Sequence, residues 1–445
     1  MRKITALFFI LVVLFASVLL GSEMTTKEGT DTLTISSKTF TIVLNTRLGV
    51  LDDIRINVDR KVVDIYTYYP EDPDGYNVYG SNGELIPNSF SYEEDENGNI
   101  LVYFFYDSGT KTFVVKNDPY YDFDIILSFS EEITAVSVPY ISEINQKVHP
   151  NFFITYAKPD KQKTVCISYS EEGRFDVKRF YPNSGRATIS AFAGPVKLIH
   201  ISEAFPEIYE EIKKDLEEFG AIGFTSYIFH GLVAFLYWLY KLTKSFGWAI
   251  ILFTIVVRLV LYPLYHLQTK SMIQMRAVQP EIEKIKKKYK DPQKQQQALT
   301  KLYREKNINP ATGCLTLLIQ LPVFFVLYAV IRYFGEMFAY SPKFLIWSDL
   351  STGGFVINLP FIIITILAGF YMSLFTSQDP RAARQGMIFN VMFPFLFYSF
   401  PSGLFLYYTT NTVIQMLITI YVYRKFGIKK LTVREVLGLP PKPVK

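Results

Sequence analysis

The 445-residue chain contains few of the side chains from which metal sites and catalytic centres are built. It has two cysteines, Cys166 in a polar, strand-like region and Cys314 at the start of an apolar run, and this number and spacing exclude a disulfide framework or a zinc-type cluster. Its four histidines are scattered: His149, His200, His230 and His266. The sequence therefore predicts no metal, no cofactor and no enzyme activity.

Acidic residues are absent from the longest apolar parts of the sequence. The long apolar runs after residue 247 contain no aspartate or glutamate before the loops begin. Hydrophobic residues make up 49% of the chain and the mean hydropathy is +0.17, which is too apolar for an ordinary soluble protein of this length. The formal net charge of +5 is mild and gives no signal for nucleic acid binding. The composition predicts a polytopic α-helical membrane protein of two or three domains.

The first 22 residues form one apolar segment behind two basic residues. Arg2 and Lys3 precede a run from Ile4 to Leu20. This run is longer than the apolar part of most signal peptides and short for a span of about 20 residues, so a cleaved signal peptide and an uncleaved anchor both remain open. We favour a transmembrane anchor over residues 1–22. No cysteine follows it, which excludes a lipoprotein signal, and the residues after it are exported in either case.

Residues 25–203 show the pattern of an all-β domain. Phe40, Ile42 and Leu44 alternate with residues that would face the other side of a strand, and similar runs recur between turn clusters such as PEDPDG and PNSG. Many short strands separated by turns predict a β-sandwich with its own core. Residues 204–223, which include EIYEEIKKDLEEF, are polar and helix-prone, and we interpret them as a linker helix to the membrane part.

The positive-inside rule orients the remaining apolar stretches. The loop 267–309 holds the largest excess of lysine and arginine and is predicted to lie in the cytoplasm. One inward crossing must then precede it, so residues 224–244, which have an apolar face at helical spacing, are read as an amphipathic helix at the exported interface rather than a span. The helical core runs from 245 to 425, and its predicted spans are 247–266, 314–333, 359–376, 385–400 and 404–423.

With the first segment, these stretches predict six spans and both termini in the cytoplasm, including the tail 426–445. The cytoplasmic loop 267–309 is predicted to be a helical hairpin, because apolar residues repeat at three- and four-residue spacing on both sides of the helix-breaking KDP. A solvated coiled-coil hairpin explains this pattern. A docking platform for an acidic or RNA-bearing partner is the sharper alternative, and four lysines would carry it: Lys284, Lys286, Lys287 and Lys288.

Arg258 lies in the middle of the apolar stretch GWAIILFTIVVRLVLYPL. A central charge costs about 2.5–3.5 kcal/mol on insertion scales, so it needs an explanation. Pairing with a carboxylate is disfavoured, because the spans contain none. The side chain could reach the cytoplasmic interface by snorkelling, or face a water-filled cavity open to the cytoplasm, and we favour the cavity. Thr254, four residues before Arg258 on the same helix face, would line this cavity together with polar residues of other spans: Gln320, Asn411 and Gln415.

At these residues the sequence resembles a known family. The segments GWAIILFTIVVRLVLYPL, QPEIEKIKKKYKD, NPATGCLTLLIQLPVFFVLY and FPSGLFLYYTTN, in this order, resemble the YidC–Oxa–Alb family of membrane protein insertases over about 224–425. The large exported β domain behind a first anchor looks like the bacterial YidC branch. In that branch the domain is periplasmic and has a β-supersandwich fold, and five of the six transmembrane helices form the insertase core.

The resemblance implies a mechanism. Members of the family insert apolar segments into the inner membrane and help them fold, without hydrolysing nucleotide, through a hydrophilic groove that is closed on the outer side. The groove arginine matches Arg258, and other groove and slide positions match Thr254, Gln320, Phe324 and Tyr408. The arginine would attract acidic residues of the outgoing tail of a substrate.

The resemblance also implies partners. They are nascent inner-membrane proteins, the lipid bilayer, the Sec translocon for some substrates, and ribosomes or targeting factors at the hairpin. The protein is expected to act as a monomer and to bind no nucleotide.

Two other function classes were weighed. A secondary transporter would need coupling carboxylates near the midplane and inverted repeats, and neither is evident. A surface enzyme on the β domain would need a convergent acid–base site, for which His149 and His200 with nearby acids give only a weak signal.

Overall fold

The computed structural model describes residues 24–58, 61–65, 75–131, 133–142, 144–223, 226–263, 273–274, 277–306, 312–377, 380–425, 427 and 430–437. The expected anchor over residues 1–22 lies outside these residues. The described chain forms two compact units. The β unit comprises residues up to Gly231 together with Gly335–Tyr340, and the helical unit comprises Leu232–Phe334 and Ser341 onward.

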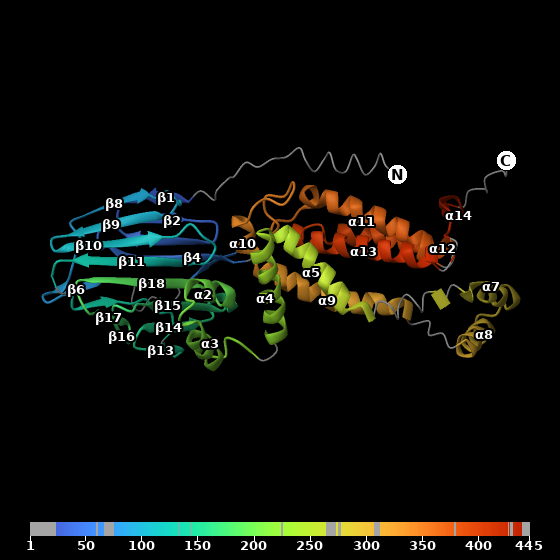
Figure 1. Ribbon diagram of the computed structural model, residues 1–445, viewed down its shortest axis with the longest axis horizontal. Helices are drawn as coiled ribbons and strands as arrows, with labels where there is room; N and C mark the ends of the chain where they lie inside the picture. Colours follow the sequence, from blue (N-terminus) through green and yellow to red (C-terminus); the bar gives the residue numbers. More distant parts are fainter. Residues whose placement is uncertain are drawn as a thin grey trace. The chain divides into compact units, whose positions relative to one another are not determined.

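The β unit contains three antiparallel sheets (Figure 1). Their strand orders are β1-β2-β3-β4-β5, β13-β14-β15-β18-β11-β10-β9-β8 and β16-β17-β12-β6-β7. The strand bounds are β1 Thr25–Glu28, β2 Thr32–Ser36, β3 Phe40–Asn45, β4 Val50–Val58, β5 Lys61–Asp64, β6 Val78–Gly80, β7 Gly83–Glu84, β8 Ser89–Glu94, β9 Ile100–Tyr106, β10 Gly109–Val115, β11 Asp122–Phe129, β12 Ala135–Ser137, β13 Gln146–Val148, β14 Phe152–Ala157, β15 Thr164–Tyr169, β16 Gly173–Asp176, β17 Arg179–Pro182 and β18 Arg186–Pro195.

The predicted alternation is present in these strands. Phe40, Ile42 and Leu44 are at most 1% exposed in β3, and buried and less buried residues alternate along β9. Because one face of each such strand turns inward, all three sheets contribute to one hydrophobic core. The prediction of an all-β sandwich domain is confirmed for this part of the chain.

The interpretation of 204–223 as a linker is wrong. Helices α2 (Leu198–Ala204) and α3 (Tyr209–Glu218) pack on the β unit, and Ile201, Ile212 and Leu216 are fully buried in its core. The sequence showed the polar face of α3 but not its partner, because three buried positions in ten are easily masked by lysine and glutamate.

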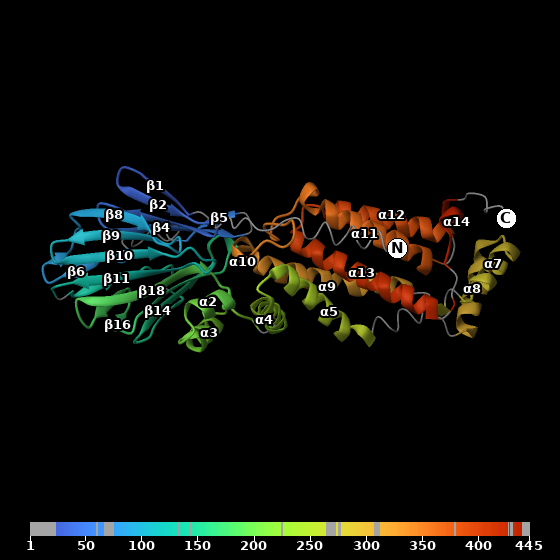
Figure 2. The ribbon, with the colours of Figure 1, turned by 45° about the horizontal axis from the view of Figure 1, so that its top comes forward.

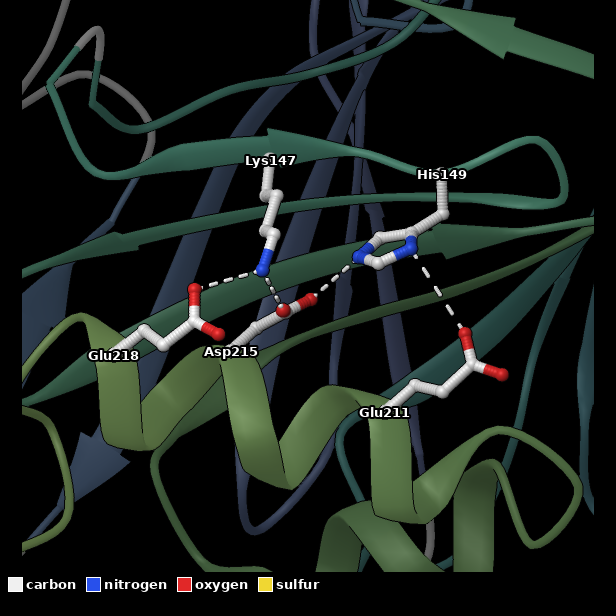
Figure 3. Close-up of polar contacts among 5 residues, drawn as sticks. All are labelled: Lys147, His149, Glu211, Asp215 and Glu218. Carbon is white, nitrogen blue, oxygen red and sulfur yellow. Dashed lines mark hydrogen bonds and ion pairs between the residues drawn. The ribbon is translucent and has the colours of Figure 1, made fainter.

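Polar contacts fasten α3 to the edge strand β13 (Figure 3). The Asp215 carboxylate is 1% exposed and accepts hydrogen bonds from Lys147 Nζ at 2.6 Å, while its other oxygen lies 2.7 Å from His149 Nε2. Lys147 also bonds Glu218 at 2.8 Å, and together the two carboxylates raise the pKa of the lysine. Buried carboxylates need such partners, so this cluster serves to hold the helix.

The predicted apolar stretches form helices whose bounds differ from the prediction by a few residues, and all of them lie in the helical unit except residues 226–231, which belong to the β unit. These helices are α4 Ser226–Thr243, α5 Phe246–Val260, α9 Thr312–Tyr333, α11 Phe355–Thr376, α12 Pro380–Leu396 and α13 Ser402–Lys425. Helices α11 and α13 run side by side in both views (Figures 1 and 2). Among the described residues, one helix, α11, is long and apolar enough by itself to cross a membrane, and Ile228–Thr243, Phe246–Val260 and Pro322–Tyr333 are shorter apolar helices.

The loop 267–309 contains the predicted helical hairpin in its described part. Helices α7 (Gln279–Lys288) and α8 (Pro292–Glu305) pack through a small core of Val278, Ile282 and Leu302. Asp291 caps α8 by accepting a hydrogen bond from the backbone N–H of Gln293 at 2.9 Å. The predicted seam therefore pairs the two helices with each other.

The described part of the predicted tail 426–445 contains a short helix. The short helix α14 (Val433–Leu437) begins with reciprocal bonds between Thr432 and Glu435, which form a capping box. Val436 is 1% exposed and packs with Leu374 and Ala383 of α11 and α12. Part of the tail is thus packed against the helical unit.

The loop 341–354 covers the ends of α5 and α13, and we call it the seal. The Phe344 ring lies on Gly247, and backbone bonds of 2.8 Å run from Ser402 N–H to Thr352 O and from Gly403 N–H to Leu350 O. A Cβ on Gly247 would come within 2.0 Å of the ring, so glycine is what permits this contact.

Gly247→Ala is therefore expected to destabilise the helical unit, although alanine is the better helix former by about 1 kcal/mol. Overpacking typically costs about 1–3 kcal/mol, since Phe344 must leave its place. Thermal unfolding in detergent, followed by tryptophan fluorescence, measures the change. Gly231→Ala is the matched control, because nothing lies within 4 Å of its added Cβ in α4. Equal melting temperatures for the Gly247→Ala variant and the wild type would contradict the seal contact.

Candidate functional site

Arg258 lies in the last turn of α5 and faces α13. Its side chain is almost buried, with the residue 7% exposed. The end of α5 suits a cation, because the carbonyl groups of a final helical turn carry partial negative charge. The arginine thus occupies the interior of the helical unit and does not extend toward solvent as in the snorkelling interpretation.

Residues one turn apart on α13 hold the guanidinium. Nε donates to Asn411 Oδ1 at 2.6 Å, Nη2 donates to the backbone oxygen of Asn411 at 2.8 Å, and Nη1 donates to Gln415 Oε1. Asn411 is 6% exposed, and Gln415 is partly buried. The i,i+4 spacing places both amides on one helix face, which is why they can grip one planar group.

These partners are neutral. An amide oxygen satisfies an N–H donor but does not cancel a unit charge, and the described helices α5, α9, α11, α12 and α13 have no aspartate or glutamate in their sequences. Asn411 and Gln415 thus fix the geometry of the guanidinium without cancelling its charge.

Thr254 precedes Arg258 by one turn of α5 and is fully buried. Its hydroxyl donates to the carbonyl oxygen of Ile250 at 2.7 Å, within its own helix. It therefore shares the helix face of Arg258 without bonding to it. The side chain of Gln320 lies outside the described residues.

Phe324 and Tyr408 have apolar surroundings. They line a small cavity of about 10 Å³ together with other apolar side chains: Phe397, Phe400, Leu404 and Phe405. The Phe324 ring lies 5.6 Å from that of Phe397 and 6.1 Å from that of Phe400. The candidate residues thus divide into a polar group around Arg258 and an aromatic group around Phe324.

The sequence does not reveal two tertiary contacts, one between helices and one between a helix and a turn. Thr365 of α11 and Thr409 of α13 share a hydrogen bond of 2.8 Å in the buried interior. Asn358 donates to the carbonyl oxygens of Tyr398 and Phe400 at 2.8 and 2.9 Å and holds the turn before α13. Their only signal was polarity inside apolar runs, which identifies an interhelical bond but not its partner.

The two histidines weighed for an enzyme are both used structurally. His149 bonds Asp215 and stacks on Phe152 with ring centroids 4.0 Å apart (Figure 3). His200 is fully buried between Tyr120 and Tyr121, and burial, with Lys197 nearby, holds its pKa well below the usual range. Both histidines are thus packed against neighbouring side chains of the β unit.

The hairpin lysines have the opposite environment. Lys284, Lys286, Lys287 and Lys288 are all exposed on α7, while Ile282 of the same helix is buried. The helix therefore presents a basic face away from the hairpin core.

Comparison with known proteins agrees with this arrangement. The family model described as 60Kd inner membrane protein matches residues 238–430. The membrane protein insertase YidC of Thermotoga maritima is 45% identical over 410 residues, which cover 88% of this chain and 89% of that protein. The insertase YidC of Aquifex aeolicus is 38% identical over 197 residues, which cover 42% of this chain and 37% of that protein.

Solved structures match as well. A crystal structure of an active YidC insertase with its first transmembrane domain resolved has a TM-score of 0.80 and 41% identity, covering 94% of this chain and 99% of that one. The crystal structure of YidC from Thermotoga maritima has a TM-score of 0.67 and 31% identity, covering 89% and 99%. Because these similarities extend over most of both chains, the chain belongs to the YidC family of membrane protein insertases.

Proposed function

We propose that this insertase works through Arg258, which attracts acidic residues in the outgoing tail of a substrate. The observation that carries the proposal is the guanidinium held by Asn411 and Gln415 in spans that contain no carboxylate. The hydrogen bonds to Asn411 and Gln415 orient the guanidinium but do not neutralise it, so its charge can interact with a passing carboxylate.

Two contributions to the free energy would drive the tail of the substrate outward. The membrane potential supplies about 2.3 kcal/mol per charge per 100 mV on an acidic tail. Burial of the apolar segment of the substrate in lipid supplies about 25 cal/mol per Å². The aromatic group around Phe324 and Tyr408 offers an apolar path along which that segment would slide. Neither step uses a nucleotide, a cofactor or a covalent intermediate.

In this proposal the protein has six spans, a periplasmic β unit and both termini in the cytoplasm of a two-membrane cell. The five helices α5, α9, α11, α12 and α13 form the insertase core, and α4 lies at the periplasmic interface. Exposed residues of α4 such as Ile228 and Trp238 suit an apolar interface, while Val233 and Leu236 are buried.

The exposed lysines of α7 would bind ribosomes or targeting factors, whose surfaces carry RNA or acidic groups. Nascent inner-membrane proteins are the substrates, and the Sec translocon acts with the protein on some of them. The protein works as a monomer in this proposal and catalyses no covalent chemistry.

Thiol labelling tests whether the Arg258 region is hydrated. In a chain with Cys166 and Cys314 replaced by alanine, we expect Gln415→Cys to react with a charged maleimide added to inverted membrane vesicles. Leu417→Cys on the same helix is the control, since Leu417 is 57% exposed and would face lipid. Labelling at 415 at least about tenfold faster than at 417 is the expected result, because a charged reagent enters water and not hydrocarbon. Equal slow labelling at both positions would refute a hydrated groove.

A further inference from the structure

Helix α10 (Gly335–Tyr340) belongs to the β unit, although it follows α9 in the chain. The prediction of a helical core from 245 to 425 did not foresee this. Met337 and Phe338 are 3% and 0% exposed, so the side chains of this helix are buried in the fold.

A single carboxylate is held at the centre of this contact. Glu336 Oε1 accepts a hydrogen bond from Tyr121 Oη at 2.9 Å, and its Oε2 accepts one from Lys197 Nζ. The side chains of Lys197 and Glu336 are only 10% and 9% exposed. A charge pair this far from water depends on both partners, because either one alone would remain as a buried charge.

The Tyr121 backbone is adapted to this position. Its φ is +64°, in the left-handed region that bulky residues avoid, and the side chain is fully buried. The ring passes over Gly194, where an added Cβ would lie 2.9 Å from Tyr121 Cβ, and it packs against His200. Such strain persists only where the surroundings impose it, so the hydroxyl is fixed in place for the carboxylate.

A second contact lies at the other end of α10. Lys38 Nζ donates to the carbonyl oxygen of Ala339 at 3.3 Å and stands 6.0 Å from the centre of the Tyr340 ring. The β unit therefore holds both ends of the six-residue helix.

The residue after Tyr340 begins the seal, the loop 341–354 of the helical unit that covers the ends of α5 and α13 through Phe344, Leu350 and Thr352. We propose that the hydrogen bonds of Glu336 to Tyr121 and Lys197 act as a latch. They hold α10 in the β unit, and because α10 leads directly into the seal, they restrain the seal. A partner or substrate that displaces the β unit would then loosen the seal through the chain itself. The inference does not depend on the role of Arg258.

Hydrogen exchange of the full-length protein in nanodiscs tests the latch. We expect Glu336→Gln, Lys197→Met and Tyr121→Phe to raise the exchange of the Phe344 and Trp347 amides, which bond each other's carbonyls across the seal, by tenfold or more. Exchange in strands β10 and β11 should stay as in the wild type. Glu131→Gln, an exposed carboxylate of the same unit, is the control and should change neither.

Replacing the Lys197–Glu336 pair by a covalent cross-link distinguishes loss of the latch from a general loss of stability. Lys197→Cys with Glu336→Cys, in a chain with Cys166 and Cys314 replaced by alanine, is joined by a short bis-maleimide. Seal exchange should rise in the open double variant and return to the wild-type rate after joining. Unchanged seal exchange in all three single variants would overturn the proposal. So would raised exchange that joining does not reverse, or equal loss of protection throughout β10 and β11, since Glu336 would then be part of the β core.

Discussion

Replacing Arg258 by alanine is expected to lower insertion of a single-span substrate with an acidic exported tail by at least about tenfold. The change removes the charge that faces the tail, and a tenfold effect corresponds to about 1.4 kcal/mol. It also leaves two oxygens of Asn411 without their donor. Insertion into proteoliposomes, normalised to the amount of folded protein, measures the result.

Arg258→Lys separates charge from geometry. Lysine keeps the positive charge, but a single ammonium cannot reproduce the planar fork that meets Asn411 and Gln415 together. We expect partial recovery of insertion relative to the alanine variant. The matched control is Arg332→Ala, an exposed arginine in the last turn of α9, which should insert the same substrate at the wild-type rate.

A substrate with a neutral tail gives the second control, because it offers no carboxylate to attract. It should be inserted equally by the wild type and by Arg258→Ala. Full insertion of the acidic-tailed substrate by a well-folded Arg258→Ala protein would show that the charge is dispensable. Burial of the apolar segment alone would then drive the reaction.

Most of the fold prediction came from the periodic spacing of apolar residues. The alternation at Phe40, Ile42 and Leu44 identified a sandwich because a strand with one buried face leaves this pattern whatever its neighbours are. The same reasoning failed for α3 and α10. Their contacts with the β unit include the buried carboxylates of Asp215 and Glu336, and a charged residue in a sequence looks the same whether it faces water or a lysine inside the fold.

Only part of the candidate site could be predicted from the sequence, because spacing shows which residues share a helix face but not what that face contacts. Asn411 and Gln415 were singled out by a four-residue spacing, which places them on one helix face before any partner is known. The sequence could not show that this face meets Arg258, since the pairing of α5 with α13 is a tertiary fact. It also could not separate Thr254, which bonds its own helix, from residues that bond a neighbour.

The second large effect is expected from Lys111 of the β unit, on the pH dependence of the free energy of unfolding. Its side chain is fully buried among the rings of Phe104, Tyr106 and Phe113, and its ammonium donates to the Tyr76 carbonyl oxygen at 2.8 Å. Burial lowers the pKa of Lys111 from 10.5 to about 7, and the charge of Glu84 offsets this only in part. The interior therefore tolerates the amine best when it is neutral.

The contribution of Lys111 to the free energy of unfolding should consequently rise with pH above neutrality. Between pH 7 and 10.5 the unfolded chain binds a proton at Lys111 that the folded β unit has released, which gives a slope of up to about 1.4 kcal/mol per pH unit. Asp118, whose pKa burial raises to about 7, acts below this window. The buried phenols of Tyr76 and Tyr106, whose pKa values burial raises, weaken the fold only above about pH 10.

Lys111→Met should remove this slope. From pH 7.5 to 9.5 the wild type is expected to gain about 2 to 3 kcal/mol of stability over the variant, since two pH units act on one proton. Urea unfolding of the full-length protein in detergent, followed by trapping of the buried Cys166 thiol in a Cys314→Ser chain, reports on this unit.

The matched control is Lys158→Met. Lys158 also stands near an aromatic ring, 5.8 Å from the centre of Tyr156, but it is exposed. Its variant should follow the wild-type pH dependence, because an exposed side chain has nearly the same surroundings in the folded and the unfolded chain. Parallel curves for the wild type and Lys111→Met would mean that Lys111 remains charged inside the fold. The aromatic rings and the Tyr76 carbonyl would then stabilise the ammonium as well as water does.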